Sequence, residues 1–270
     1  MGVAIVVVAY RTGDTLARCL DRAHADAPDA PLLLVDHAYR PAQHAALVES
    51  RPWLRSLPSP DNPGFAAGAN RGIEQALADG AGHVLLLNAD VYVRPGCVGR
   101  LTAAAGGSGA ASPWLAGAGD AAYRGGRIDW ERGYAGHEEG SDDYLIGGCI
   151  MISRAAWQAT GPFDESFFLY CEDVDWCLRA RAAGVPLALV AEELADHDGG
   201  AATGAGTSEL WAYWWSRNRI RLLRKHGRGS PTAVATRQAV GAARGLVRGS
   251  TPRRVALARV RGAIAGLRGV

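Results

Sequence analysis

At 270 residues, the chain is long enough for one globular domain with appendages, and its 48% hydrophobic and 21% charged residues exclude a disordered chain. Its five cysteines are scattered without a CxxC pair, which is typical of reduced thiols in a cytoplasmic protein rather than of a disulfide framework. No run approaches the roughly 18 apolar residues of a membrane span, and the apolar start lacks the basic flank of a signal peptide. We therefore expect neither a span nor a signal peptide.

The formal net charge of +2 conceals an uneven distribution. Fourteen of the 29 Lys and Arg residues follow Glu209, which is the last acidic residue of the chain. This asymmetry predicts that residues 227–270 form a basic, helical extension that differs physically from the main domain at residues 1–226.

The first hundred residues alternate apolar runs with helical patterns. The apolar runs predict buried strands at 3–9, 31–35, 83–87 and, more weakly, 53–57. Helices are expected after Asp14 and over 66–78. Strands and helices at this spacing are typical of right-handed βαβ units and predict a parallel sheet. Ligands of such sheets bind at the carboxyl ends of the strands, where Asp36 and Asp90 both fall.

The second half of the chain is less regular. Residues 103–140 are rich in Gly and Ala, which predicts loops with a hairpin, and strands are expected at 144–153 and 187–191. Helices are expected at 172–183 and 211–226. Near the C-terminus a further amphipathic helix is predicted from apolar residues at helical spacing between arginines, namely Leu257, Val260, Ile264 and Leu267.

The segment Asn88-Ala-Asp90 follows a buried strand directly. Carboxylate and amide oxygens are ligands for a hard cation such as Mg²⁺ or Mn²⁺. Such a cation would bridge the phosphates of a nucleotide sugar and neutralise the charge that grows on the leaving diphosphate. The alternative is that Asp90 caps a turn.

The segment Asn62–Asn70 contains Gly64, Gly68 and several alanines, so its backbone can approach a ligand closely. It opens into a helix, whose N-terminus favours anions. The alternative is a tight strand-to-helix turn.

Residues 161–176 combine five carboxylates with five aromatic side chains. Glu172, Asp173 and Asp175 open a predicted helix, where carboxylates are electrostatically favoured and stay ready to accept a proton. Asp175 and Arg179 stand four residues apart and can pair on the helix surface. The alternative is a capped helix start with an acidic surface cluster.

Four blocks of the sequence, taken in order, resemble glycosyltransferase family 2 and especially its rhamnosyltransferase-like members. They span residues 1–226 and read VVVAY, NPGFAAGANRGI, LLLNADV, and GGCIMISR followed by GPFDESFFLYCEDVDWCLRARAAG. The resemblance implies an α/β GT-A fold, with a Rossmann-like, mostly parallel central sheet flanked by helices. It places the nucleotide-sugar half at 1–100 and the acceptor half at 101–226.

The resemblance also implies an inverting sugar transfer. The donor would be a dTDP- or UDP-linked sugar, with dTDP-rhamnose as the first candidate. The acceptor would be a hydroxyl of a glycan, a lipid-linked saccharide or a small natural product.

For single residues, the resemblance implies that Asp90 binds a divalent metal, Mg²⁺ or Mn²⁺, beside Asn88, and that His197 completes the metal site. It makes Asp173 the catalytic base, while Glu172 orients the acceptor or the base. The guanidinium of Arg217 is a candidate for the leaving diphosphate. The remaining donor-binding candidates are Ala9, Tyr10, Asp36, Asn62, Gly64, Phe65, Gly68, Asn70 and Ala89. The acceptor-binding candidates beside Glu172 are Gly147, Gly148 and Tyr170.

The sequence departs from the family pattern at three places. Arg11 stands where relatives usually have Asn, and His37-Ala38 stands where Asn and Ser are usual. After His197 the usual Gly-x-Ser is replaced by Gly200–Thr203. The first two departures lie around the expected nucleoside and leave the metal and the base untouched, so we expect an active enzyme.

Two other functions compete with sugar transfer. A nucleotidyltransferase would need early basic residues aimed at a triphosphate, and only Arg11 is available. A non-enzymatic sugar-nucleotide-binding module is disfavoured because Asp90, Asp173 and His197 are all present.

The basic extension has two interpretations. It could contact the inner face of a membrane peripherally, or it could be a helical arm that packs on the catalytic domain or on a second subunit. We favour the arm, because the apolar stripe is short and interrupted by glycines. Nucleic-acid binding is disfavoured, because no aromatic residue follows Trp215.

Overall fold

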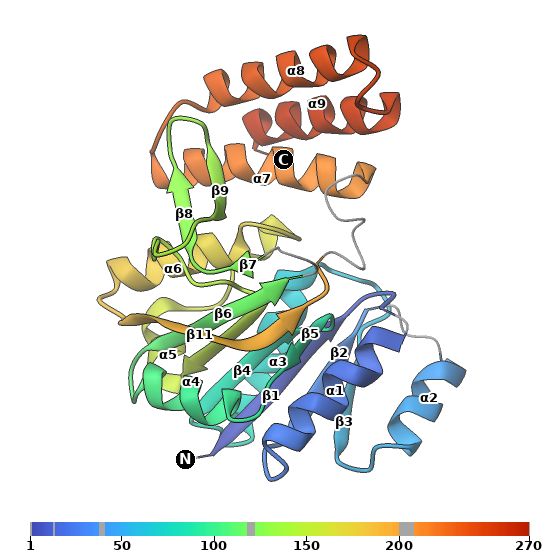
Figure 1. The fold of residues 1–270 in the computed structure, drawn as a ribbon, viewed down its shortest axis with the longest axis vertical. Helices are drawn as coiled ribbons and strands as arrows, with labels where there is room; N and C mark the ends of the chain where they lie inside the picture. The colour runs from blue at the N-terminus through green and yellow to red at the C-terminus, as the bar shows by residue number, and fades with distance from the viewer. Residues whose placement is uncertain (1, 13, 38–40, 118–121, 200–207, 270) are drawn as a thin grey trace.

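The computed structural model describes residues 2–12, 14–37, 41–117, 122–199 and 208–269. Two of the predicted features, Ala38 and Gly200–Thr203, lie outside these ranges. The chain forms one large sheet with helices on both faces, and a group of three helices lies beyond one end of the sheet (Figure 1).

Within the described ranges, the large sheet has nine strands in the order β3-β2-β1-β4-β10-β6-β11-β5, with β7 paired to β6. The strands are β1 (Val3–Ala9), β2 (Leu32–Asp36), β3 (Leu54–Pro58), β4 (His83–Asn88), β5 (Val91–Val93), β6 (Ala110–Gly117), β7 (Ala122–Tyr123), β10 (Cys149–Ser153) and β11 (Leu187–His197). The first four predicted strands are confirmed as β1 to β4, which are all parallel. β10 runs antiparallel between β4 and β6. Beyond it, β6 and β11 run parallel to each other and in the same direction as β1 to β4, so most strands of the sheet point the same way.

Helices α1 (Asp14–Asp26) and α4 (Cys97–Ala105) cover one face of the sheet, and α3 (Phe65–Ala78), α5 (Arg154–Thr160) and α6 (Glu172–Ala182) cover the other. Helix α2 (Pro41–Glu49) lies beside the edge strand β3. Alternate residues of β1 divide between the two faces, since Val6 belongs to one core cluster and Val7 to the other. A continuous apolar run is therefore what this strand requires.

The stretch 103–140 is more ordered than the predicted loops. The predicted hairpin is confirmed as β8 (Gly126–Asp129) and β9 (Tyr134–His137), but β6 is a central strand that the prediction missed. β6 consists largely of small residues with one proline, so it lacks the β-branched run that identified β1.

Two later strands have different limits from those predicted. β10 begins only at Cys149, and Tyr144–Gly148 forms an irregular segment instead. β11 continues to His197 through register shifts after Val190. His197 is therefore the last residue of a strand and pairs with Val91 of β5.

The C-terminal helices are α7 (Glu209–His226), α8 (Pro231–Val247) and α9 (Arg253–Arg268). α9 packs along α7, as the arm interpretation predicts. The packed face matches the predicted stripe only in part: Leu267 packs against the cluster that contains Ile220 and Ala263, but Leu257 and Ile264 are 52% and 43% exposed. Small residues make most of the contact, and a Cβ at Gly266 would lie 2.6 Å from the carbonyl oxygen of Arg217.

All five cysteines are buried, and none of them forms a disulfide. No helix in the described ranges is long and apolar enough to span a membrane.

Candidate active site

Two cavities adjoin each other at the carboxyl ends of β1 and β4. The first has a volume of about 240 Å³ and lies over the end of β1 and the β4–β5 turn. The second, of about 190 Å³, lies against the start of α6. Both are lined by Phe65, Asn88, Leu169, Tyr170 and His197, so a ligand in one cavity would lie next to a ligand in the other.

Most of the predicted donor-binding residues line the first cavity. They come from the end of β1, the start of α3 and the β4–β5 turn, and they are Ala9, Tyr10, Asn62, Gly64, Phe65, Asn88, Ala89 and Asp90. Gly64 has a φ of +104°, and a Cβ there would lie 2.6 Å from the carbonyl oxygen of Phe168. Glycine is therefore required where the start of α3 meets the cavity wall.

The end of β2 contributes a residue that the sequence did not single out for binding. His37, rather than Asp36, lines the first cavity. Asp36 lines neither cavity, and its Oδ2 atom lies 2.9 Å from the Nδ1 atom of His44. A Cβ at Gly68 would lie 2.3 Å from His37 Nε2, so this glycine lets α3 pack against the histidine. Burial lowers the pKa of His37, which keeps its ring neutral at pH 7.

Besides Asp36 and Gly68, two more predicted donor-binding residues, Asn70 and Arg217, line neither cavity. The side-chain amide of Asn70 donates to the carbonyl of Phe163 and to Glu165, each over 3.0 Å, and its oxygen accepts from the Phe163 N–H. Arg217 is 7% exposed and donates to the carbonyl of Ser166 over 2.9 Å. Both side chains thus hold the segment that leads into α6.

Asp90 and His197 lie close together beside the first cavity. Their Oδ1 and Nε2 atoms are 3.4 Å apart, and the pairing of β11 with β5 brings them together. Asn88 Oδ1 and His197 Nδ1 are buried without a hydrogen-bond partner.

This arrangement fits a divalent cation held by one carboxylate and one imidazole, with the remaining positions taken by ligand oxygens. No group of three His, Cys, Asp or Glu side chains with metal-binding geometry occurs in the part of the chain that the structure describes. A cation here would therefore need oxygen atoms of a bound ligand or of water to complete its coordination.

Asp173 and Glu172 line the second cavity at the N-terminus of α6. The carboxylate of Asp173 accepts hydrogen bonds from the N–H of Gly147 over 3.1 Å and of Val174 over 2.8 Å. Gly147 and Gly148 line the same cavity, as does Tyr170. The predicted acceptor-binding residues therefore lie together with the predicted base.

Burial changes the acidity of both carboxyl groups. Burial, followed by the charge of Asp173, raises the pKa of Glu172 to about 8. Burial also raises the pKa of Asp173, despite the hydrogen bonds from Val174 and Gly147. Glu172 Oε2 is buried without a hydrogen-bond partner. A carboxylate whose pKa is raised towards neutrality is a better proton acceptor than an ordinary surface aspartate.

Residues 168–171 form a wall that borders both cavities, and the backbone of this wall is strained. Phe168, Tyr170 and Cys171 have φ values of 54°, 70° and 68°, a region that non-glycine residues rarely occupy. The side-chain nitrogen of Asn218, which is fully buried on α7, lies 2.7 Å from the Leu169 carbonyl and 3.0 Å from that of Tyr170. It is also 2.5 Å from a third carbonyl, that of Phe167.

Aromatic contacts add to this support. Phe168 stacks on Trp214 with ring centroids 4.5 Å apart, and Tyr170 meets Trp215 edge to face. Helix α7 therefore holds the conformation of the wall. The sequence showed only a polar residue within an aromatic helix, which did not identify Asn218.

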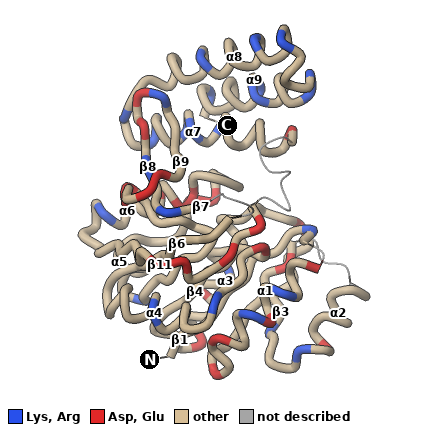
Figure 2. The backbone as a smooth tube through the Cα atoms, in the orientation of Figure 1, with Lys and Arg blue, Asp and Glu red and all other residues tan. Residues whose placement is uncertain are grey.

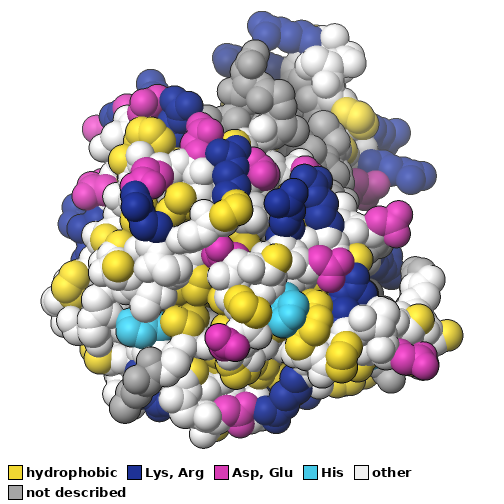
Figure 3. Space-filling view, turned by 60° about the horizontal axis from the view of Figure 1, so that its bottom comes forward, with side chains coloured by type: hydrophobic (Ala, Val, Ile, Leu, Met, Phe, Trp, Pro, Cys, Tyr) yellow, Lys and Arg dark blue, Asp and Glu magenta, His cyan; other side chains and the backbone are white. Residues whose placement is uncertain are grey.

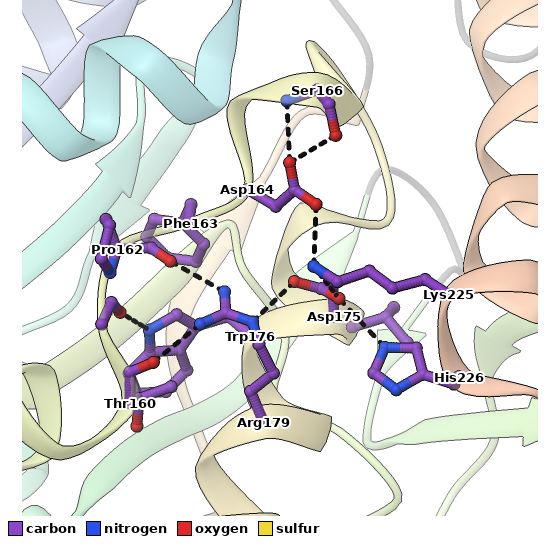
Figure 4. A network of polar contacts seen from close by, with 12 residues as sticks. Thr160, Pro162, Phe163, Asp164, Ser166, Asp175, Trp176, Arg179, Lys225 and His226 are labelled. Atoms are coloured by element: carbon purple, nitrogen blue, oxygen red, sulfur yellow. Dashed lines mark hydrogen bonds and ion pairs between the residues drawn. The ribbon is translucent and has the colours of Figure 1, made fainter. Parts of the chain in front are cut away.

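Asp175 is the third carboxylate of α6, and it has a structural role. It is fully buried and contacts Arg179 at 2.9 Å, Lys225 at 2.8 Å and His226 at 3.0 Å. Lys225 also pairs with Asp164, just before the short helix η1 (Glu165–Phe167), as Figure 4 shows. The predicted pairing of Asp175 with Arg179 is confirmed, and the network ties α6 to the end of α7.

The comparisons with known proteins agree with this geometry. A family model described as glycosyl transferase family 2 matches residues 4–160. The chain is 30% identical over 216 residues to N-acetylglucosaminyl-diphospho-decaprenol L-rhamnosyltransferase of Mycobacterium tuberculosis. This alignment covers 67% of the chain and 70% of that protein. The chain belongs to glycosyltransferase family 2. A shorter match, 38% identical over 45 residues and 17% of each chain, is to rhamnosyltransferase WbbL of Escherichia coli.

Solved structures show the fold of this glycosyltransferase. GalNAc-T7, crystallised with UDP, GalNAc and Mn²⁺, superposes with a TM-score of 0.65 at 15% identity, over 83% of this chain and 48% of that one. Residues 1–349 of TarS from S. aureus, in complex with UDP-GlcNAc, give 0.59 at 14% identity, over 83% and 66% of the two chains. The predicted GT-A fold is confirmed, and the enzyme spans about half the length of GalNAc-T7.

Proposed function

We propose that this glycosyltransferase transfers a sugar, with inversion, from a dTDP- or UDP-linked donor to a hydroxyl of a lipid-linked saccharide. The observation that carries the proposal is the pair of adjoining cavities. Asp90 borders the first, Glu172 and Asp173 border the second, and His197 lines both, so that the two cavities adjoin. We assign the first cavity to the donor and the second to the acceptor.

The donor diphosphate is assigned to the edge of the first cavity beside Asp90 and His197. A divalent cation, Mg²⁺ or Mn²⁺, would supply there the positive charge that stabilises the departing diphosphate. Asn88 lines both cavities, and its buried Oδ1 has no hydrogen-bond partner, so we assign it to a donor hydroxyl. GalNAc-T7, which has the same fold, was solved with Mn²⁺ and UDP, and this supports the proposed cofactor.

Asp173 is the proposed base. Its carboxylate accepts the proton of the acceptor hydroxyl while the oxygen attacks the anomeric carbon on the face opposite the diphosphate. The N–H groups of Gly147 and Val174 fix the carboxylate, so that its orientation does not change during attack. Glu172, whose pKa is raised, stays protonated at neutral pH and can donate a hydrogen bond to the acceptor.

The match to the mycobacterial rhamnosyltransferase supports the proposed acceptor class. The mycobacterial relative is named for a diphospho-decaprenol acceptor and a rhamnosyl donor, and it aligns over most of both chains. We therefore propose dTDP-rhamnose as the first donor to test, and an N-acetylglucosaminyl lipid diphosphate as the first acceptor.

The test is a donor panel with the purified chain. dTDP-rhamnose and several UDP-sugars are incubated with Mn²⁺ or Mg²⁺ and a short-chain lipid diphosphate acceptor, and products are followed by mass spectrometry. We expect one donor class to give a glycosylated lipid, with nucleoside diphosphate released only when metal is present. Nucleoside monophosphate or pyrophosphate as the product would instead indicate nucleotidyl transfer.

A further inference from the structure

The turn between α8 and α9 forms an exposed end of the molecule with an unusual composition. Leu246 is 41% exposed and Val247 is 89% exposed, the highest value among the large hydrophobic residues that the structure describes. The N–H groups of Ser250 and Thr251 both donate to the Gly245 carbonyl and close the turn. We call this end the α8–α9 tip, and it comprises Arg244, Leu246, Val247, Arg248, Arg253 and Arg254, all of them exposed.

The same composition continues along the outer face of α9. Arg254, Leu257, Arg261, Ile264 and Arg268 follow one another at alternating spacings of three and four residues, so they form one stripe along the helix. Leu257 is 52% exposed and Ile264 is 43% exposed. The packed face of α9, made of small residues against α7, is a different face. Single apolar side chains thus alternate with arginines on the exposed stripe.

The charge of this region is entirely positive. Helices α8 and α9 contain no Asp or Glu, and Figure 2 shows only Lys and Arg colouring on them. On the sheet domain, in contrast, both charges intermingle over the face shown in Figure 3. Arg253 and Arg254 also stand in the first turn of α9, where the helix dipole disfavours cations. An anionic partner at the tip would reduce the repulsion among the arginines and their unfavourable interaction with the helix dipole.

We propose that the α8–α9 tip and the exposed stripe of α9 dock on an anionic lipid bilayer. The arginines would lie at the level of the phosphates, while Val247, Leu246 and Leu257 enter the headgroup region. This inference deepens the proposed function and rests on it for the lipid-linked acceptor, which such docking would bring within reach.

Two other partners fit the observations less well. A protein interface normally gathers its apolar residues into a core depleted of charge, whereas here each apolar residue stands between arginines. A nucleic-acid groove normally offers aromatic stacking, and α8 and α9 contain no aromatic residue.

The test is co-sedimentation of the full chain with vesicles of phosphatidylcholine, alone or with about one-third phosphatidylglycerol. We expect binding to the anionic vesicles only. The tip variant R248E/R254E should bind at least about tenfold more weakly. The matched control R22E/R132E makes the same charge change at exposed positions on α1 and in the turn between β8 and β9, and should bind like the wild type. A third variant, V247S, should weaken binding without changing charge.

Equal binding of the tip variant and the wild type would overturn the inference, as would equal binding to neutral vesicles. A concentration-dependent dimer in sedimentation of the protein alone, abolished by R248E/R254E in the absence of any vesicle binding, would assign the tip to a second copy instead. The vesicle assay uses no sugar donor. Tip-dependent binding by a chain that transfers no sugar would therefore refute the proposed function alone, and tip-independent transfer without vesicle binding would refute the docking alone.

Discussion

The backbone N–H of Gly147 donates a hydrogen bond to Oδ2 of Asp173 over 3.1 Å, and the two residues are so close that a Cβ at Gly147 would lie 2.6 Å from the Cβ of Asp173. Glycine is therefore needed at position 147 for the proposed base to keep its position. The neighbouring Gly148 is different, because a Cβ there would meet its nearest atom only at 3.4 Å.

This difference makes a matched pair of variants. Gly147→Ala should displace Asp173 and reduce kcat by about 100-fold, since sub-ångström errors in a reacting group are costly. Gly148→Ala should retain most of the activity. Steady-state kinetics and a melting temperature for each variant check this, and equal activity of the two would show that the Gly147 contact does not position the base.

A second prediction concerns Asn218, which supports the strained wall from α7. Asn218→Ala leaves carbonyls of that wall without their donor and should destabilise the fold by about 1–3 kcal/mol. Because the wall borders both cavities, KM for donor and acceptor should both rise. Gln238→Ala is the control. Gln238 lies on α8 and hydrogen-bonds to Ser216 of α7, the helix that carries Asn218, but it does not contact the wall. Similar KM values for both variants would argue against a positioning role.

The buried carboxyl pair predicts how stability depends on pH. The folded pKa of Glu172, about 8, lies above its ordinary value of 4.5, so the folded state binds more protons between these two pH values. The contribution of Glu172 to the free energy of unfolding is therefore fully present below pH 4.5 and is lost as the pH rises through 8. Glu172→Gln should remove this loss and raise the melting temperature at pH 8.5 by at least about 3 °C.

The corresponding measurement is a melting curve at several pH values for both proteins. A wild-type profile that rises between pH 5 and 8 relative to that of Glu172→Gln would contradict the raised pKa. The variant should also keep an acid limb in its rate profile, because Asp173 still has to lose its proton.

Metal and donor binding should be coupled at Asp90. Thermal shifts with UDP or dTDP should appear only with Mn²⁺ or Mg²⁺, because the phosphates complete the coordination. Asp90→Asn and His197→Ala should abolish these shifts. The control is Asp196→Asn. Asp196 precedes His197 on β11, and its carboxylate pairs with Arg94, so this variant should leave the shifts intact. Metal-independent stabilisation by the nucleotides would count against the assignment.

The sequence predicted well the strands at the edge of the sheet that borders the proposed donor cavity. β1, β2 and β4 are buried on both faces and carry continuous apolar runs, so their ends could be located, and with them Asp90 and the turn before α3. β6 could not be located in this way. Its first half is buried like β1, but it contains mostly small residues, which pack closely without giving an apolar pattern.

Side chains within a recognised motif were harder to assign. Asn70 belongs to the same block as Asn62, yet its amide holds Phe163 and Glu165 while Asn62 lines the first cavity. Sequence spacing alone does not distinguish a polar residue that faces a ligand from one that faces a loop. Asn218 escaped notice for the same reason, because its partners are backbone carbonyls about fifty residues away.

The C-terminal helix shows a further limit. Helical spacing identified Leu257 and Ile264 as an apolar face, but the contact with α7 uses glycines and alanines on another face. Close approach of two helix backbones favours small residues. Glycine and alanine are only weakly hydrophobic, so a search for apolar residues at helical spacing does not identify such a face.

The central claim is that Asp173 removes the acceptor proton during sugar transfer. Its most direct test compares the wild type with Asp173→Asn under saturating donor, acceptor and Mn²⁺, with donor affinity measured separately. We predict that Asp173→Asn binds the nucleotide sugar as the wild type does but transfers it at least about 1000-fold more slowly, in line with the loss of a general base. Wild-type transfer by Asp173→Asn would contradict the account.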